Sequence, residues 1–330
     1  ADFYLRHGRS KDAISHLKLL RSQRDDPQLQ LSLARALLGV GKTEEAQEIL
    51  KAMIGYQADA GEFDVRFATD PHNVDAYAIL AAHYRGESSQ IEHADRVMRQ
   101  CTTVNAASAA AHLARGRHLL ASAGDSSDRT AQQEEAKNEI RRAAELSPDD
   151  ADVIAAMASL ETSQKNFTKA KSWLERGIAK HPTREEFYRS RAGIALLEED
   201  PEEAAGILRS GLKALPNSWP LLLMCAEVDL SNGNFQATRQ AAAKLRDDAR
   251  FVVLADYLEA QTLMAERNWS ESSQQFEELL PQLLALRPDL ADDAYLALAR
   301  CYEQLGQSDQ QREANRRLLA LEPASVEGRF

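Results

Sequence analysis

The stretches 148–182, PDDADVIAAMASLETSQKNFTKAKSWLERGIAKHP, and 182–216, PTREEFYRSRAGIALLEEDPEEAAGILRSGLKALP, carry the same pattern. Their prolines, Pro148, Pro182 and Pro216, recur at one constant interval. Before each proline, at the same distance every time, stand a small residue and then a large apolar one. These residues are Ala136, Ala170 and Ala204, and Ile140, Leu174 and Leu208. Small, apolar and proline positions that recur on a period of about 34 residues predict stacked helical hairpins.

The composition agrees with an all-α fold. The chain has 330 residues, of which 44% are hydrophobic, and contains 15 glycines and 10 prolines. Alanine, leucine, glutamate, glutamine and arginine are plentiful, and these are good helix formers. Because each unit of a repeat array contacts mainly its neighbours, one core can run through the whole chain. The length therefore does not predict separate domains.

The charge and hydropathy exclude some partners. The chain has 51 acidic and 40 basic residues, a net charge of −11, whereas proteins that bind duplex nucleic acid need a basic face. We therefore expect no nucleic-acid partner. The sequence contains no apolar run long enough to predict a membrane span within these residues.

The start lacks a secretory signal pattern, but Ala1 is not Met, and the first residues match the second half of a hairpin. We expect a truncated N-terminus, which leaves both a cytoplasmic and an exported location open.

The cysteines do not predict a metal site or a disulfide. Cys101, Cys225 and Cys301 are odd in number and widely separated. Neither a zinc cluster nor a disulfide framework has this spacing. We interpret all three as small buried apolar residues, and we expect no cofactor.

The repeats cover most of the chain. Residues 1–26 are interpreted as a partial repeat with a break at 8–10, and residues 27–330 as about eight hairpins in one array. In the first full unit, Leu33 and Leu37 lie on one helix, and Gly41 suits the left-handed conformation that ends it.

Two insertions interrupt the period, near 54–73 and 123–133. In the first, we expect a lengthened second helix whose aromatic residues, Tyr56, Phe63 and Phe67, pack on the neighbouring repeat; the alternative is a functional insertion. The second is predicted to be a polar tip, and it lacks the alternating ligands, glycine and glutamate of a calcium loop.

With these positions assigned, the array resembles the tetratricopeptide repeat family over nearly its whole length. The family pattern of a large residue, leucine, a small residue and an aromatic one is matched by Tyr77, Leu80, Ala81 and Tyr84, and by Tyr295, Leu298, Ala299 and Tyr302 followed by Gly306 and Pro323. The resemblance implies a right-handed superhelical solenoid of antiparallel helix hairpins. The last repeat departs from the family pattern at Gln311 and Asn315, where alanine and a large apolar residue are expected.

The resemblance also implies where a partner would bind. In this family the first helices of the hairpins line a concave groove, and the second, fifth, ninth and twelfth positions of each repeat face it. The corresponding candidates in this sequence are Arg35, Arg85, Arg115, His118, Arg189, Leu223, Glu227, Leu230, Tyr257, Gln261, Met264 and Arg300. The lysine and asparagine pattern with which some members bind a terminal carboxylate does not recur at these positions.

Two interpretations of these candidates stay open. The arginines before residue 120 would form a basic wall for a carboxylate or phosphate, or would pair with neighbouring glutamates. The apolar residues after residue 220 would suit an amphipathic peptide, although the register near Tyr257 is loose and some of them would then belong to the core.

The sequence predicts a binding protein and not an enzyme. It has no phosphate-binding glycine loop, no paired histidines at one-turn spacing and no strand-turn-helix nucleophile. His112 and His118 lie six residues apart, on different helix faces. We therefore expect a scaffold that binds a peptide or a partner protein in the concave groove. The alternatives are a structural spacer or assembly subunit that uses the convex face or the array ends, and a helical domain of a longer enzyme or membrane-anchored protein.

Overall fold

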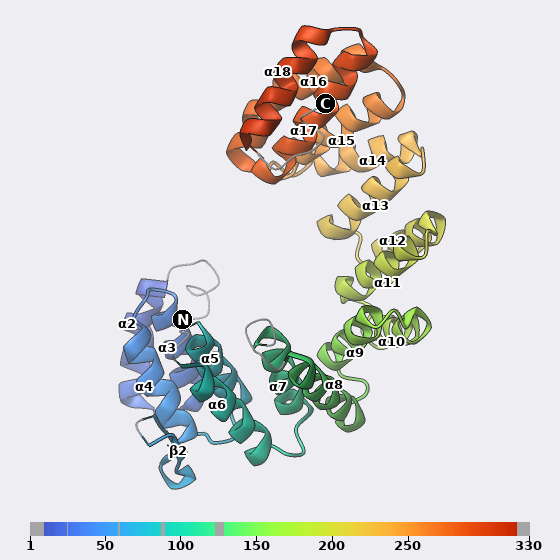
Figure 1. Cartoon of the computed structure of the whole chain (residues 1–330). Helices are drawn as coiled ribbons and strands as arrows, with labels where there is room; N and C mark the ends of the chain where they lie inside the picture. The colour runs from blue at the N-terminus through green and yellow to red at the C-terminus, as the bar shows by residue number, and fades with distance from the viewer. Residues whose placement is uncertain (1–9, 25, 59, 87–89, 123–128, 322–330) are drawn as a thin grey trace. The chain divides into compact units, whose positions relative to one another are not determined.

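The computed structural model describes residues 10–24, 26–58, 60–86, 90–122 and 129–321 (Figure 1). Apart from one short two-stranded hairpin and one 3-10 turn, the elements in this part of the chain are α-helices. The predicted all-α solenoid is therefore confirmed. Gly8 and Arg9 of the predicted break, and the predicted polar tip at 124–128, lie outside the described residues.

The chain divides into two compact units, 1–173 and 174–330. The first unit contains α2 (Ser10–Gln23), α3 (Pro27–Leu38), α4 (Thr43–Ile54), β1 (Tyr56–Gln57), β2 (Glu62–Phe63), the 3-10 helix η1 (Val65–Phe67), α5 (Val74–Arg85), α6 (Ile91–Val104), α7 (Ala109–Ser122), α8 (Arg129–Leu146) and α9 (Ala151–Ser163). Helix α10 (Phe167–Lys180) begins in the first unit and ends in the second.

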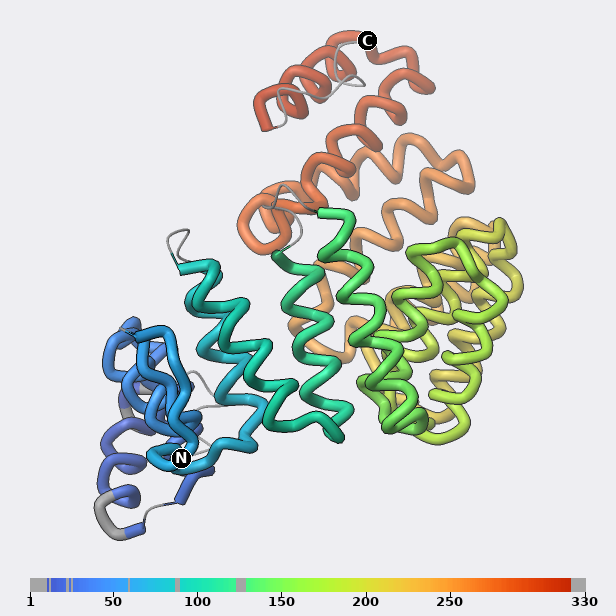
Figure 2. Tube along the Cα trace, turned by 60° about the horizontal axis from the view of Figure 1, so that its bottom comes forward, coloured from blue at the N-terminus to red at the C-terminus, as the bar shows by residue number. Residues whose placement is uncertain are grey.

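The second unit continues with four hairpins. Their helices are α11 (Glu185–Leu197), α12 (Pro201–Ala214), α13 (Trp219–Ser231), α14 (Phe235–Leu245), α15 (Val252–Ala265), α16 (Trp269–Leu286), α17 (Pro288–Gln304) and α18 (Ser308–Leu321). The two helices of each hairpin run antiparallel and pack against each other (Figure 2). We call the odd-numbered helix of each pair the first helix and the even-numbered one the second helix.

Local sequence signals fix where the helices begin. Asp26 accepts a hydrogen bond from the backbone N–H of Gln28, and Pro27 occupies the first turn of α3. The Asp200 side chain likewise accepts from a backbone N–H in the first turn of α12, and Pro201 begins that helix. Proline is suited to a first turn because the N–H that it lacks would have no intrahelical partner there.

The hairpin turns contain a left-handed residue at a fixed place. Lys165, Glu199, Gly233 and Arg267 have φ values of 60°, 61°, 75° and 66°, and they recur at the same interval as the prolines. Only one of the four is glycine, although this region favours glycine. The packing of the hairpins therefore imposes the turn conformation, whatever the residue.

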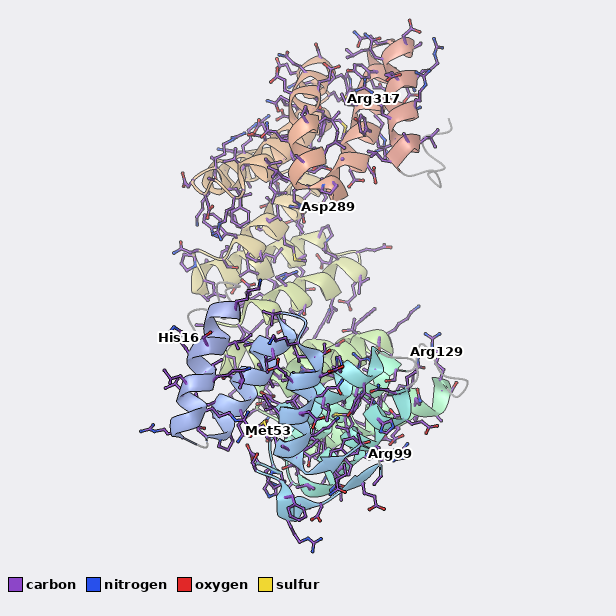
Figure 3. All side chains as sticks on the ribbon, turned by 90° about the vertical axis from the view of Figure 1, so that its left-hand side faces the viewer. His16, Met53, Arg99, Arg129, Asp289 and Arg317 are labelled. Atoms are coloured by element: carbon purple, nitrogen blue, oxygen red, sulfur yellow. The ribbon has the colours of Figure 1, made fainter. Side chains whose placement is uncertain are left out.

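The repeating small and apolar positions form the core. Ala136, Ala170, Ala204, Ile140, Leu174 and Leu208 all have at most 2% of their surface exposed. Helix α12 approaches its neighbours so closely at Gly211 that an added Cβ would lie 2.8 Å from Cγ of Tyr188. In the first unit, Met53, labelled in Figure 3, is fully buried. The small residues thus allow the close helix contacts that the sequence predicted.

The insertion at 54–73 does not lengthen the second helix, so this prediction is wrong. Helix α4 ends at Ile54, and Gly55 takes the left-handed conformation with φ 69°. The backbone N–H of Asp64 then donates to the carbonyl of Gly55 at 2.8 Å, and a Cβ on Gly55 would lie 2.3 Å from the carbonyl oxygen of Asp64. The glycine therefore allows the chain to fold back as a β-hairpin, in which Tyr56 pairs with Phe63.

The aromatic residues of this insertion behave differently from one another. The Tyr56 and Phe63 rings stack with centroids 4.6 Å apart, and Tyr56 also contacts Tyr84 of the next repeat at 6.3 Å. Packing on the neighbouring repeat is confirmed for these two. Phe67, by contrast, is 72% exposed, so it does not pack there.

The loop before α8, the cysteines and the hydropathy of the helices were also predicted from the sequence. The loop predicted at 123–133 is too long, because α8 already begins at Arg129. The cysteines Cys101, Cys225 and Cys301 are free and buried, as predicted. Among the described helices, none has the length and hydropathy needed to cross a membrane.

Candidate functional site

The first helices of each unit lie side by side. In the second unit α11 contacts α13, α13 contacts α15, and α15 contacts α17 (Figure 1). In the first unit α5 contacts α7 and α7 contacts α9. Within the described residues, consecutive second helices make no contacts of similar extent. In each unit these first helices therefore form one layer with a solvent-facing side. We call this side the inner face.

Two buried hydroxyl groups fix the repeat register in the second unit. The Oγ1 atom of Thr238 donates to the carbonyl of Ala226 at 3.5 Å, and the Oγ atom of Ser272 donates to the carbonyl of Ala260 at 2.9 Å. Both bonds join a second helix to the small residue of its first helix, and the second bond repeats the first one period later. This register assigns Tyr257, which the sequence left uncertain, to the fifth position of its repeat.

An apolar strip follows the inner face of the second unit. It consists of Leu196 on α11, Leu223 and Leu230 on α13, Met264 on α15 and Leu296 on α17. Leu196 is 38% exposed, and the other four are partly buried. The strip thus crosses four consecutive first helices and leaves apolar surface accessible to solvent on each.

Tyr257 belongs mostly to the core. Its side chain is 6% exposed, and its ring packs edge-on against Phe276 with the centroids 5.9 Å apart. The hydroxyl accepts a hydrogen bond from Nε2 of Gln261 at 2.9 Å. Of the two alternatives that the sequence left open, Tyr257 is therefore a core residue, whereas Gln261 remains partly exposed.

Acidic groups surround the Tyr257 hydroxyl. Burial raises the pKa of Tyr257, and the negative charges of Asp293 and Glu227 raise it further. Glu227 lies on α13 and Asp293 on α17, so the two acids flank α15 from either side, and both are exposed. We call Glu227 and Asp293 the acidic pair.

Glu227 is exposed to solvent and yet has much protein around it. The loss of solvation raises the pKa of its carboxyl group, and the charge of Arg287 opposes this rise. The guanidinium of Arg287 forms an ion pair with Asp289, labelled in Figure 3, at 2.6 Å.

Two arginine candidates lie on the same face. Arg189 on α11 and Arg300 on α17 are both exposed. By the repeat register they stand at the fifth and ninth positions of their repeats. The inner face of the second unit therefore presents charges of both signs around the apolar strip.

In the first unit, the inner face carries an ion pair between neighbouring first helices. Nη2 of Arg35 on α3 lies 2.7 Å from Oδ2 of Asp75 on α5, and both side chains are exposed. Arg85 ends α5 and is partly buried. For Arg35, the structure agrees with the interpretation that the arginine pairs with a neighbouring acid.

Two other candidates face away from the inner face. Arg115 forms ion pairs with Glu135 and Glu139 of α8 and donates to Oγ1 of Thr102 on α6 at 3.0 Å. Nε2 of His118 lies 2.7 Å from Oδ1 of Asp95, also on α6, and the imidazole is buried. Both side chains point toward second helices, so their assignment to the groove was wrong.

The cause is a register error of two residues. A Cβ on Gly116 would lie 2.7 Å from Cγ1 of Ile140 and 3.1 Å from the carbonyl of Ala136. Gly116, and not Ala114, is therefore the small residue of this repeat. The ninth and twelfth positions are then Arg117 and Leu120, and both are exposed. The insertion before α8 hides this relation, because it lengthens the spacing between Gly116 and Ala136.

A cavity of about 350 Å³ lies on the other side of the second unit, between α16 and α18. Tyr295, Leu298 and Tyr302 of α17 line it, together with Pro281 and Leu284 of α16. The Tyr302 hydroxyl donates to the carboxylate of Glu277. Sequence reasoning missed this cavity, because the core residues that form its floor look like ordinary repeat positions.

The described residues were compared with the ligand sets that hold metal ions. Among them, no three His, Cys, Asp or Glu side chains are placed to hold a metal ion. The acidic and histidine side chains around Arg115 pair instead with that arginine or with each other.

Comparison with known proteins gives a family match and several structural likenesses. The model of the tetratricopeptide repeat matches residues 292–325. A tetratricopeptide repeat protein from Parabacteroides merdae is 10% identical, with a TM-score of 0.54 over 78% of this chain and 96% of its own. Human IFIT1, solved as a dimer with m7Gppp-AAAA, is 14% identical, with a TM-score of 0.52 over 98% of this chain and 76% of its own. No curated protein matches in sequence. At these identities the structures show a shared fold and nothing about ligands.

Proposed function

We propose that this chain, a tetratricopeptide-repeat protein by its repeat at 292–325 and by its fold, is a non-catalytic scaffold. In this proposal it binds a segment of a partner protein on the inner face of its second unit. Helical repeat arrays commonly use extended concave surfaces for binding. The general role as an interaction scaffold follows from the fold.

The apolar strip is the observation that carries the proposal. Leu223, Met264 and Leu296 pack partly against the core, and the part of each that stays accessible to solvent is apolar surface whose exposure costs free energy. Here Leu223, Leu230 and Met264 occupy groove positions of consecutive first helices. Contiguous apolar surface with a polar rim is typical of protein interaction sites. In the first unit, the described inner face carries the Arg35–Asp75 ion pair as well as the exposed Leu120, whereas in the second unit apolar residues stand at groove positions of four consecutive first helices.

The proposal is tested by comparing two variants of the full chain in capture from extracts of the source cells. Leu223→Gln with Met264→Gln changes the inner face, whereas Leu284→Gln changes the rim of the cavity between α16 and α18. Far-UV circular dichroism and thermal unfolding check that both variants fold. We expect the inner-face variant to lose the partners that the unchanged chain captures, and Leu284→Gln to keep them. An unchanged set of partners with the inner-face variant would refute the proposal.

The cavity supports the second candidate function, a spacer or assembly subunit that makes contacts through its outer side. Leu284 is 42% exposed at the rim of the cavity, and the volume is within the range of ligand pockets. This alternative predicts the opposite result in the same experiment. Leu284→Gln would then lose the partners, and the inner-face variant would keep them.

A further inference from the structure

We infer that the contact between α14 and α15 is an electrostatic joint, which is held mainly by ion pairs. At this joint the last two hairpins, α15 with α16 and α17 with α18, open as one block when salt screens the charges. We call these two hairpins the α15–α18 block. Such a joint exists whichever face of the unit binds a partner, so it goes beyond the proposed function.

The apolar core of the second unit is divided at its first helices. One cluster joins α11, α12 and α13, a second joins α13, α14 and α15, and a third joins α15 to α18. In the first unit, by contrast, one cluster extends from α2 to α7. The second cluster is therefore the apolar link between the α15–α18 block and the hairpins before it.

This apolar link contains few large side chains. From α14, α15 and α13 in turn, its buried members are Ala242, Leu245, Ala255, Leu258, Ala226 and Leu222. Half of these residues are alanines, which bury little apolar side chain, and the hydrophobic contribution follows the apolar area that is buried. The apolar contact alone therefore attaches the α15–α18 block only modestly.

Two arginines bracket the buried residues of α14, one within the helix and one just after its end. Arg239 donates from Nε to Glu259 at 3.0 Å and from Nη1 to Glu266 at 2.7 Å. Arg246 donates from Nε to Asp256 at 3.0 Å. Glu259 and Asp256 lie on α15, and Glu266 follows its last residue. Charge-assisted bonds to carboxylates are stronger than neutral ones, so these pairs supply much of the attachment.

The two glutamates depend on Arg239. Within the described residues, neither Glu259 nor Glu266 forms a salt bridge with any other side chain. Hydrogen bonds from Arg239 and its positive charge hold the pKa of Glu266 below its usual range. The Arg239 side chain is 38% exposed, so dissolved ions can screen the pairing. Without Arg239, two partly buried negative charges would face the same position, which opposes closure of the joint.

The test is native-state hydrogen exchange of the full chain, followed by mass spectrometry. Protection of the amides in a helix reports the opening that exposes them. We compare about 0.05 M with about 1 M NaCl, at which the screening length falls several-fold. The amides of α15 to α18 should together exchange at least about threefold faster at the higher salt concentration, and those of α11 and α12 should change less.

Two variants at one position test whether Arg239 holds the joint. Arg239→Met keeps an apolar stem and removes the charged bonds. It should speed exchange throughout α15 to α18 at least about tenfold, which corresponds to about 1.4 kcal/mol, and should reduce the effect of salt. Arg239→Lys keeps the charge and loses the planar fork, so its exchange should lie between that of the unchanged chain and that of Arg239→Met.

The matched control removes an arginine that pairs inside the block. Arg312 pairs with Asp309 of the same helix, α18, and both are exposed. Arg312→Met should change protection in α15 to α17 less than about twofold, because exposed pairs contribute little. An equal loss in Arg312→Met and Arg239→Met would overturn the inference. A loss confined to α14 and α15 in Arg239→Met would also overturn it, and so would protection that salt leaves unaltered in the unchanged chain.

Discussion

Two glycines of α12 differ in their surroundings, and replacing each with alanine should change stability in opposite directions. At Gly206 an added Cβ meets nothing within 4 Å. At Gly211 it would lie 2.8 Å from Cγ of Tyr188 and 3.0 Å from Cδ1 of Leu221. Alanine is favoured over glycine in a helix interior by about 1 kcal/mol, and this gain applies at both positions.

The difference between the two variants comes from packing. Gly206→Ala should stabilise the chain by up to about 1 kcal/mol. At Gly211, overpacking costs about 1 to 3 kcal/mol, because the ring of Tyr188 is buried and has little room to move. Gly211→Ala should therefore be destabilising by up to about 2 kcal/mol after the helix gain is subtracted.

Urea and thermal unfolding followed by circular dichroism at a helix wavelength measure the effect. For a unit of this size, about 1 kcal/mol corresponds to about 2 to 4 °C in Tm. Gly206→Ala should raise the Tm of the transition that involves the second unit, and Gly211→Ala should lower it. Equal stabilisation by both variants would contradict the close approach of α12 to Tyr188.

Three further predictions concern other parts of the molecule. Ser272→Ala should destabilise the second unit by about 1 kcal/mol in urea unfolding, because it removes the buried hydrogen bond to the carbonyl of Ala260; an unchanged midpoint would count against the repeat register. Burial raises the pKa of Cys101 to about 12 and that of Cys225 to about 11, so both thiols should react with a disulfide reagent at mildly alkaline pH only as fast as the chain unfolds, and at once in denaturant. The loss of solvation raises the pKa of Glu227, so the folded chain holds this proton more tightly than the unfolded chain does; the free energy of unfolding should therefore fall as pH rises through the range in which glutamate ionises, and this fall should be smaller in Glu227→Gln, as measured by urea unfolding at several pH values.

The fold was predictable because its signals repeat. One alanine at helical spacing means little, but Ala136, Ala170 and Ala204 recur on one period and all prove buried. The same period sets the repeat register on α13 and α15, and two buried hydroxyl bonds support that register. Repetition thus supplied the evidence that no single motif contained.

The predictions failed where the period was interrupted. Before α8 an insertion hid the relation between Gly116 and Ala136, and Arg115 was therefore assigned to the wrong face. At Gly55 the sequence contains a glycine that ends a helix, but the hairpin that follows depends on a backbone hydrogen bond to Asp64, which no local pattern specifies. Contacts between distant residues decide such segments, and one sequence does not reveal them.

The left-handed turns at Lys165, Glu199, Gly233 and Arg267 make the chain modular. Since the backbone has the same conformation at each of them, a segment such as 199–232 has equivalent junctions at its two ends. Such a segment can be duplicated or removed with the neighbouring junctions unchanged, and the array then changes length by one hairpin. Each added hairpin would extend the inner face by one helix while its groove positions stay in register. The length of the inner face is therefore set by the number of modules, and its chemistry by a few residues within each.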